Sequence, residues 1–268
     1  WPCAPPWFVL VACFAGAVER GLRGLRVRES HAGALIGALF AGALAGKLDW
    51  AIADLANSSR AIDAQQVKLG MWAKENLPKD AVIGVNDTGA IAYFSGRKTF
   101  DVVGLTTQGE ARYWVAGAGS RYEHYERLGP ARLPTHFIVY PQWMAMAPIL
   151  GERLFEATVH DQSILGGATK VAYRADYEVL GKAALPLDDP PPTLLTGELD
   201  VSDLESEAER GFELGPTTDG DNLVFTRWGE GGLAVADGGR QNRATDRFRL
   251  ALPERGPALL IGRFGSKE

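Results

Sequence analysis

The stretch that decides the fold class runs from Ala81 to Gly104 and reads AVIGVNDTGAIAYFSGRKTFDVVG. Its two ends, residues 81–85 and 99–103, are short apolar runs rich in β-branched residues, a pattern that predicts buried strands. The piece between them, residues 89–94, is predicted to be a short helix, and residues 95–98 form a predicted turn. Strands separated by helical segments indicate an α/β domain with a mainly parallel sheet.

The same pattern continues on both sides of this stretch. A helix is predicted to begin at the capping residues 57–59 and to end at Pro78, because proline cannot continue a helix. Further strands are predicted for residues 135–140, 154–160 and 170–174, the first of them bounded by two prolines. We therefore assign residues 51–183 to one α/β domain.

The last third of the chain has a different sequence pattern. Residues 184–193 read ALPLDDPPPT, and their three consecutive prolines predict an extended linker. Residues 194–268 hold short apolar or alternating runs separated by glycine, proline and asparagine, which favours an all-β module of the sandwich type. The visible strands are too few for a closed sandwich, so we expect the module to be truncated.

The first fifty residues contain two apolar stretches, residues 7–18 and 32–46, on either side of a loop with four arginines. A helix that crosses a bilayer needs about 20 residues, and the second stretch reaches this length if Lys47 extends to the interface beside Trp50. We therefore predict a transmembrane helical hairpin over residues 1–50. The arginines place its loop in the cytoplasm and the rest of the chain outside the cytoplasm.

Composition sets further limits. The chain has 268 residues and a net charge of −5, so it has no electrostatic basis for binding nucleic acid. Its two cysteines, Cys13 in the first apolar stretch and Cys3 just before it, leave none in the remaining part, and this rules out a disulfide there. No Met precedes Trp1, and we expect the chain to be a fragment of a longer membrane protein.

Motifs for chemistry are scarce. Asp87-Thr88-Gly89 matches the aspartic protease triplet, but such proteases need two aspartates, so a helix-capping role near Gly89 is favoured over a hydrolase that uses Asp87. The acidic run 203–209 fits a solvated helical turn better than a calcium loop. The four histidines lack metal-ligand spacing, and the sequence gives no indication of a cofactor. The histidines are His31, His124, His136 and His160.

The run from Ala64 to Thr107 resembles bacterial membrane glycosyltransferases of the C superfamily, relatives of protein O-mannosyltransferases and aminoarabinose transferases. In these proteins a multi-span membrane body precedes an extracytoplasmic region with a motif of the form N-D-x-G-A-I-x-Y-F-S-G-R followed by D-x-V-G-L. The matching residues are Asn86, Asp87, Gly89, Ala90, Ile91, Tyr93, Phe94, Ser95, Gly96, Arg97, Asp101, Val103, Gly104 and Leu105. The resemblance covers roughly residues 50–180.

The resemblance implies transfer of a sugar from a polyprenyl-phosphate donor to an extracytoplasmic acceptor at a bacterial inner membrane. The family's catalytic acidic residue lies in the first extracytoplasmic loop, far upstream, so no catalytic residue is expected in this chain. Any divalent metal that the family uses would bind in that upstream part as well. The polar motif residues are the site candidates, in a supporting role. They are Asn86, Asp87, Tyr93, Arg97 and Asp101.

The alternative function is a non-enzymatic, membrane-anchored module that binds a glycan or a protein. In that hypothesis the β module of residues 194–268 binds the ligand, with Trp228 as a stacking residue, and the α/β domain is a spacer.

Overall fold

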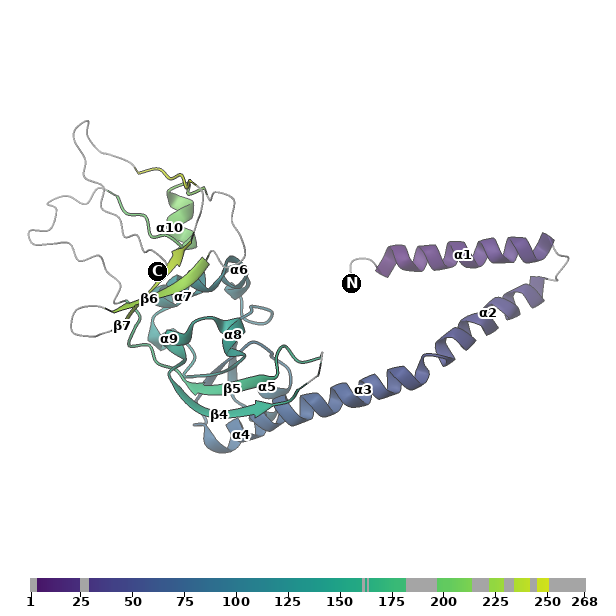
Figure 1. Cartoon of the computed structure of the whole chain (residues 1–268), viewed down its shortest axis with the longest axis horizontal. Coiled ribbons are helices and arrows are strands. Elements are labelled where there is room, and N and C mark those ends of the chain that lie inside the picture. The colour runs from purple at the N-terminus through teal and green to yellow at the C-terminus, as the bar shows by residue number, and fades with distance from the viewer. Residues whose placement is uncertain are drawn as a thin grey trace, which may run out of the picture. The chain divides into compact units, whose positions relative to one another are not determined.

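The computed structural model describes residues 4–24, 29–160, 162, 164–181, 197–213, 222–228, 234–241 and 245–250 (Figure 1). The chain divides into two compact units, residues 1–60 and residues 61–268. The second unit is an α/β domain, as the sequence predicts, and it contains all the strands described below.

The first unit consists of helices α1 (Ala4–Gly24) and α2 (Glu29–Ala45) and most of α3 (Leu48–Ile62). Among the described residues, no helix combines the length and the apolar character that crossing a membrane requires. Helix α1 carries Glu19 and Arg20 near its end, and α2 has 17 residues against the roughly 20 that a span needs. The predicted membrane hairpin over residues 1–50 is therefore not supported.

Helix α3 is followed directly by a π-helical turn, η1 (Asp63–Val67), and by α4 (Lys68–Asn76). The predicted helix start at residues 57–59 is wrong, because these residues lie inside α3. There Asn57 accepts a hydrogen bond from Arg60 at 3.0 Å instead of capping a helix end. The predicted end is confirmed: Leu77, the residue before Pro78, is already extended.

The main sheet has five strands in the order β2-β1-β3-β5-β4. The strands are β1 (Val82–Val85), β2 (Lys98–Asp101), β3 (His136–Val139), β4 (Glu152–Thr158) and β5 (Thr169–Arg174). Strand β1 pairs in parallel with β2 and β3, whereas β5 pairs antiparallel with β3 and β4. The sheet is thus mixed, which corrects the expectation of a mainly parallel one. The connection from β4 to β5, residues 159–168, is shorter than the crossover that parallel neighbours need, so the two strands run in opposite directions.

Two apolar clusters cover the two faces of this sheet, and successive strand residues alternate between them. One cluster joins α4 and α5 (Ala90–Ser95) to the sheet and includes Leu69, Ile83 and Ile138. The other joins Phe137 and Val139 of β3 to four helices on the opposite side (Figure 1). These helices are α6 (Glu110–Ala116), α7 (Ala118–Leu128), α8 (Pro141–Met144) and α9 (Ala147–Leu150).

The C-terminal part contributes a helix and a second, two-stranded sheet. Strands β6 (Asn222–Trp228) and β7 (Ala234–Arg240) pair antiparallel and pack on α7, where Ala236 joins the core. Helix α10 (Leu204–Glu209) begins at Asp203, whose side chain accepts the N–H groups of Glu205 and Ser206. The predicted linker 184–193 and residues 251–268 of the predicted all-β module lie outside the described residues. The sandwich arrangement of residues 194–268 therefore stays a prediction.

Candidate functional site

The strand order places a change of direction at β1. From β1 the chain crosses through α5 to β2 on one side, and it later returns to place β3 on the other side. In open α/β sheets, ligands bind outside the carboxyl ends of the strands at such a switch point. Here those ends are followed by Asn86 and Asp87 after β1, and by Tyr140 after β3.

An ion pair between Asp87 and Lys170 occupies this edge of the sheet. The Lys170 side chain, on β5, is completely buried, whereas one third of the Asp87 side chain (33%) is exposed. The same carboxylate oxygen, Oδ2, also accepts a hydrogen bond from the Gln66 side chain at 3.2 Å. Burial lowers the pKa of Lys170, and the negative charge of Asp87 opposes that effect.

Tyr140 and Gln65 complete the buried side of the cluster. The Lys170 ammonium group lies 4.3 Å from the centre of the Tyr140 ring, and the Tyr140 hydroxyl donates to Gln65 Oε1 at 2.7 Å. Gln65 in turn donates to the carbonyls of Gly167 and Ala168 at 3.1 and 2.9 Å. Burial, with a contribution from the charge of Asp87, raises the pKa of Tyr140 to about 12.

The π-helical turn explains how two consecutive glutamines reach one cluster. Gln65 and Gln66 are both buried, although neighbours on an α-helix point about 100° apart. In a π-helix the hydrogen bonds run over five residues, so the turn is wider and holds one extra residue. Such turns are frequent at functional sites.

Asn86 is the outlier of the region. Asn86 is only 5% exposed, yet neither Nδ2 nor Oδ1 of its side chain has a hydrogen-bond partner among the described residues. Buried amides are nearly always bonded, because leaving one unpaired costs roughly 1–3 kcal/mol.

The remaining motif candidates are not part of this cluster. The Arg97 guanidinium donates to four backbone carbonyls, three of them around the C-terminal end of α4. It thereby satisfies carbonyls that a helix end leaves without partners. Tyr93 is 81% exposed, and its ring contacts the edge of Phe94.

Asp101 also has a structural role. It is buried at the end of β2, and its carboxylate accepts the N–H groups of Val103, Gly104 and Thr106. These bonds fix the loop that follows the strand. Of the five candidates, the structure therefore brings Asn86, Asp87 and Asp101 to the carboxyl edge of the sheet, where Asp101 is bonded to its own loop, and it places Tyr93 and Arg97 elsewhere.

The residues that surround Asp87 were not predicted from the sequence. Lys170, Tyr140, Gln65 and Gln66 are far from it along the chain, and none belongs to the motif. One usable signal was a lysine at the start of the apolar run KVAY, because a charged residue in such a strand is rarely buried without a partner.

A second buried polar region lies between α7 and β7. Glu123 accepts the Gly238 N–H at 2.7 Å, and its carboxyl group is hydrogen-bonded to that of Asp200. Burial, followed by the charges of Asp200, Glu126 and Asp237, raises the pKa of Glu123 to about 9. Burial and neighbouring aspartates raise the pKa of Asp200 to about 6.

Helix α10 is attached beside this region by ion pairs. Asp203 binds Arg127, Glu205 binds Arg112, and Glu207 takes two bonds from Arg240 at 2.5 and 2.8 Å. The predicted helical turn at residues 203–209 is confirmed, although Glu207 is buried rather than solvated.

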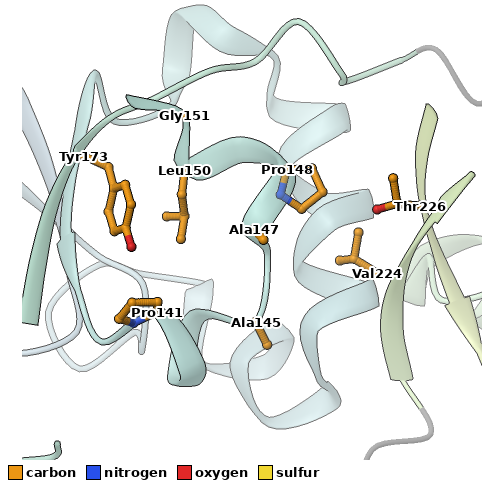
Figure 2. Close-up of a pocket in the computed structure, with 9 residues that line it drawn as sticks. All are labelled: Pro141, Ala145, Ala147, Pro148, Leu150, Gly151, Tyr173, Val224 and Thr226. Atoms are coloured by element: carbon orange, nitrogen blue, oxygen red, sulfur yellow. The ribbon is translucent and has the colours of Figure 1, made fainter. Parts of the chain in front are cut away.

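A metal centre is not indicated in the part of the chain that the structure describes, since it contains no group of three metal-binding side chains. A hollow of about 410 Å³ lies between α8, α9, β5 and β6 (Figure 2). Its walls include Pro141, Pro148, Tyr173 and Val224 and are mainly apolar, so it offers little for chemistry.

Comparisons with known proteins identify one family. No curated protein and no solved structure matches the chain. The model of the family described as "Domain of unknown function (DUF8728)" matches residues 58–199, which include η1, the whole main sheet and the Asp87–Lys170 cluster. The chain therefore belongs to the DUF8728 family.

Proposed function

We propose that this chain is the non-catalytic, extracytoplasmic part of a membrane glycosyltransferase that transfers a sugar from a polyprenyl phosphate. The observation that carries the accessory role is the use of the motif's polar side chains. Arg97 and Asp101 are bonded to the backbone of their own domain, and Asp87 is paired with buried Lys170. A motif used in this way maintains a fold, while the sugar transfer takes place elsewhere in the protein.

The exposed apolar side chains of the first unit support a membrane partner in this proposal. Large apolar side chains of α1, α2 and α3 are more than half exposed, and patches of this kind mark contacts with lipid or with another protein. They are Val9, Leu10, Phe14, Leu39, Leu44, Leu48, Trp50, Ile52 and Leu55. We assign to them contact with the bilayer or with the membrane body, and to residues 194–268 a sandwich-like module on the outer side.

The direct test is a transfer assay. The purified 268-residue chain in detergent is incubated with radiolabelled polyprenyl-phosphate mannose, polyprenyl-phosphate glucose or polyprenyl-phosphate aminoarabinose and a lipid A or peptide acceptor. We expect no transfer, while a purified complete glycosyltransferase given its own donor serves as the positive control. Transfer by the chain itself would contradict a non-catalytic role.

Membrane sidedness is tested separately. Cys3 and Cys13 are replaced by serine, and the exposed Lys98 is changed to cysteine in the gene's complete product. A membrane-impermeant maleimide should label Lys98→Cys in intact spheroplasts. Labelling that requires lysis would place the α/β domain in the cytoplasm and refute the proposal.

A further inference from the structure

The candidate site contains a buried polar side chain to which no described residue is hydrogen-bonded. Every other motif side chain at a strand end is bonded, but the Asn86 amide has neither donor nor acceptor satisfied by a described residue. An amide offers two donors and one acceptor with two lone pairs. Its position after β1, at the switch point of the sheet, is where ligands bind in folds of this kind. A ligand that bonds this amide would offset the cost of burying it.

The charges at the site indicate what kind of ligand fits. Lys170 is fully buried, contacts both Asp87 and the Tyr140 ring, and is therefore unavailable to an anion. Asp87 is already neutralised by that lysine, so it attracts a free cation weakly. The pair has no net charge, and this favours a neutral ligand.

The hydrogen-bonding groups further limit the kinds of ligand that fit. Both bonds that described residues make to the Asp87 carboxylate end on Oδ2, and the side chain is one-third exposed, which leaves Oδ1 as an acceptor. Asn86 adds donors and an acceptor on the adjacent residue. Hydroxyl groups both donate and accept, so a ligand with several neighbouring hydroxyls matches this combination.

An exposed aromatic ring lies beside the same cluster. Trp143, in α8 just after β3, is 42% exposed, and its ring centre is 5.3 Å from that of Tyr140. Tyr140 in turn contacts Lys170. Binding sites combine apolar or aromatic surface with a few placed polar groups, and an indole can cover the C–H face of a sugar ring.

We infer that the carboxyl edge of β1 and β3 binds a neutral carbohydrate, with Asn86 and Asp87 bonding its hydroxyls and Trp143 stacking on one ring. The inference deepens the proposed function, on which it rests for the biological role of the ligand: the carbohydrate would belong to the acceptor. Binding itself requires no catalytic activity.

In the experiment, the full chain in detergent is titrated with neutral oligosaccharides of glucose, mannose, galactose and N-acetylglucosamine. Binding is measured by isothermal titration calorimetry. Sodium phosphate and calcium chloride are the charged comparators. We expect at least one oligosaccharide to bind with micromolar to millimolar Kd and the two salts not to bind. Trp143→Ala should weaken that binding at least tenfold, whereas Tyr93→Ala, at a more exposed aromatic residue outside the site, should not change it.

Asn86→Leu provides the sharpest variant. Without a ligand it removes an unpaired buried amide, so its thermal midpoint should be equal to or above that of the parent, while carbohydrate binding is lost. Asn86→Ala is the second variant if leucine is too large. Binding that survives both Asn86 variants and Trp143→Ala, or no binding by any oligosaccharide, overturns the inference. Carbohydrate binding by a chain that also transfers sugar on its own would uphold the inference and reject the proposed function.

Discussion

Asp87 with Lys170 and Glu123 with Asp200 are two pairs of ionisable groups in which one member, Lys170 or Glu123, is buried and the other reaches solvent. The two pairs balance charge in different ways. In the first, a carboxylate faces a lysine, so both can be charged together. In the second, Glu123 has the carboxyl groups of Asp200, Glu126 and Asp237 nearby, and burial together with these charges raises its pKa, so that it keeps its proton at neutral pH. A buried charge beside an opposite charge is tolerated at neutral pH. A carboxyl group buried beside other carboxyl groups makes the stability of the fold depend on pH.

The first pair should show the largest effect when one partner is removed. Asp87→Ala leaves the Lys170 ammonium group fully buried without a carboxylate, and loss of one partner of a buried pair costs about 3–5 kcal/mol. Urea unfolding followed by circular dichroism measures this loss. A change below about 1 kcal/mol would mean that Lys170 is neutral in the folded protein and that the pair is not an ion pair.

Replacing both residues tests whether Asp87 and Lys170 stabilise the fold as a pair. In Asp87→Leu with Lys170→Met, no charge is left buried, and apolar residues often replace a buried ion pair at little cost. We expect the double variant to recover most of the stability that Asp87→Ala loses. If the double variant loses as much unfolding free energy as the two single variants lose in sum, the two side chains do not interact. A double-mutant cycle measures this.

The second pair predicts a dependence on pH. The folded pKa of Glu123, about 9, lies above its ordinary value of 4.5, so between these values the folded protein binds more protons than the unfolded chain. Its stability therefore falls as the pH rises through that window. Glu123→Gln keeps an acceptor for the Gly238 N–H without the charge, and it should stabilise the protein by roughly 1–3 kcal/mol at pH 8.5.

The control for this prediction is the same variant at low pH. At pH 4.5 Glu123 is protonated in the folded state, and parent and Glu123→Gln should have similar urea midpoints. Lys170 acts in the other direction: its lowered pKa means that stability rises as the pH approaches 10.5. A parent whose stability does not fall between pH 5 and 8.5 would contradict the raised pKa of Glu123.

The smallest effect is expected at the exposed end of the α10 attachment. Arg112 is mostly exposed and Glu205 partly so, and exposed ion pairs contribute about 0–1 kcal/mol. Glu205→Gln should therefore lower stability by less than 1 kcal/mol, and 0.5 M sodium chloride should remove the difference. A larger loss that salt does not affect would show that this pair is as important as the buried ones.

The sequence was sufficient to predict those parts of the fold that depend on neighbouring residues. The runs at 81–85 and 135–140 are apolar, β-branched and bounded by turn residues, and they form β1 and β3. Strand direction was missed because it depends on the connections between strands: β5 has the same local pattern whether it runs parallel or antiparallel. The predicted helix cap at residues 57–59 failed because the helix continues through it.

The candidate site could be predicted in part. The motif correctly directed attention to Asn86 and Asp87, but it also included Arg97 and Asp101, whose bonds are to nearby backbone. Asp87 and Lys170 are 83 residues apart, and only the folded sheet brings them together. A charged side chain gives no sign in a single sequence of whether its partner is water, backbone or a distant residue.

The π-helical turn at Asp63–Val67 constrains the number of residues in this part of the chain. Gln65 and Gln66 both point inward because the turn contains one residue more than an α-helix would have there. Deleting either glutamine would restore regular α-helix and leave one amide to serve both Tyr140 and Asp87. Natural variants of this domain should therefore tolerate substitution more readily than a change in residue number at this turn.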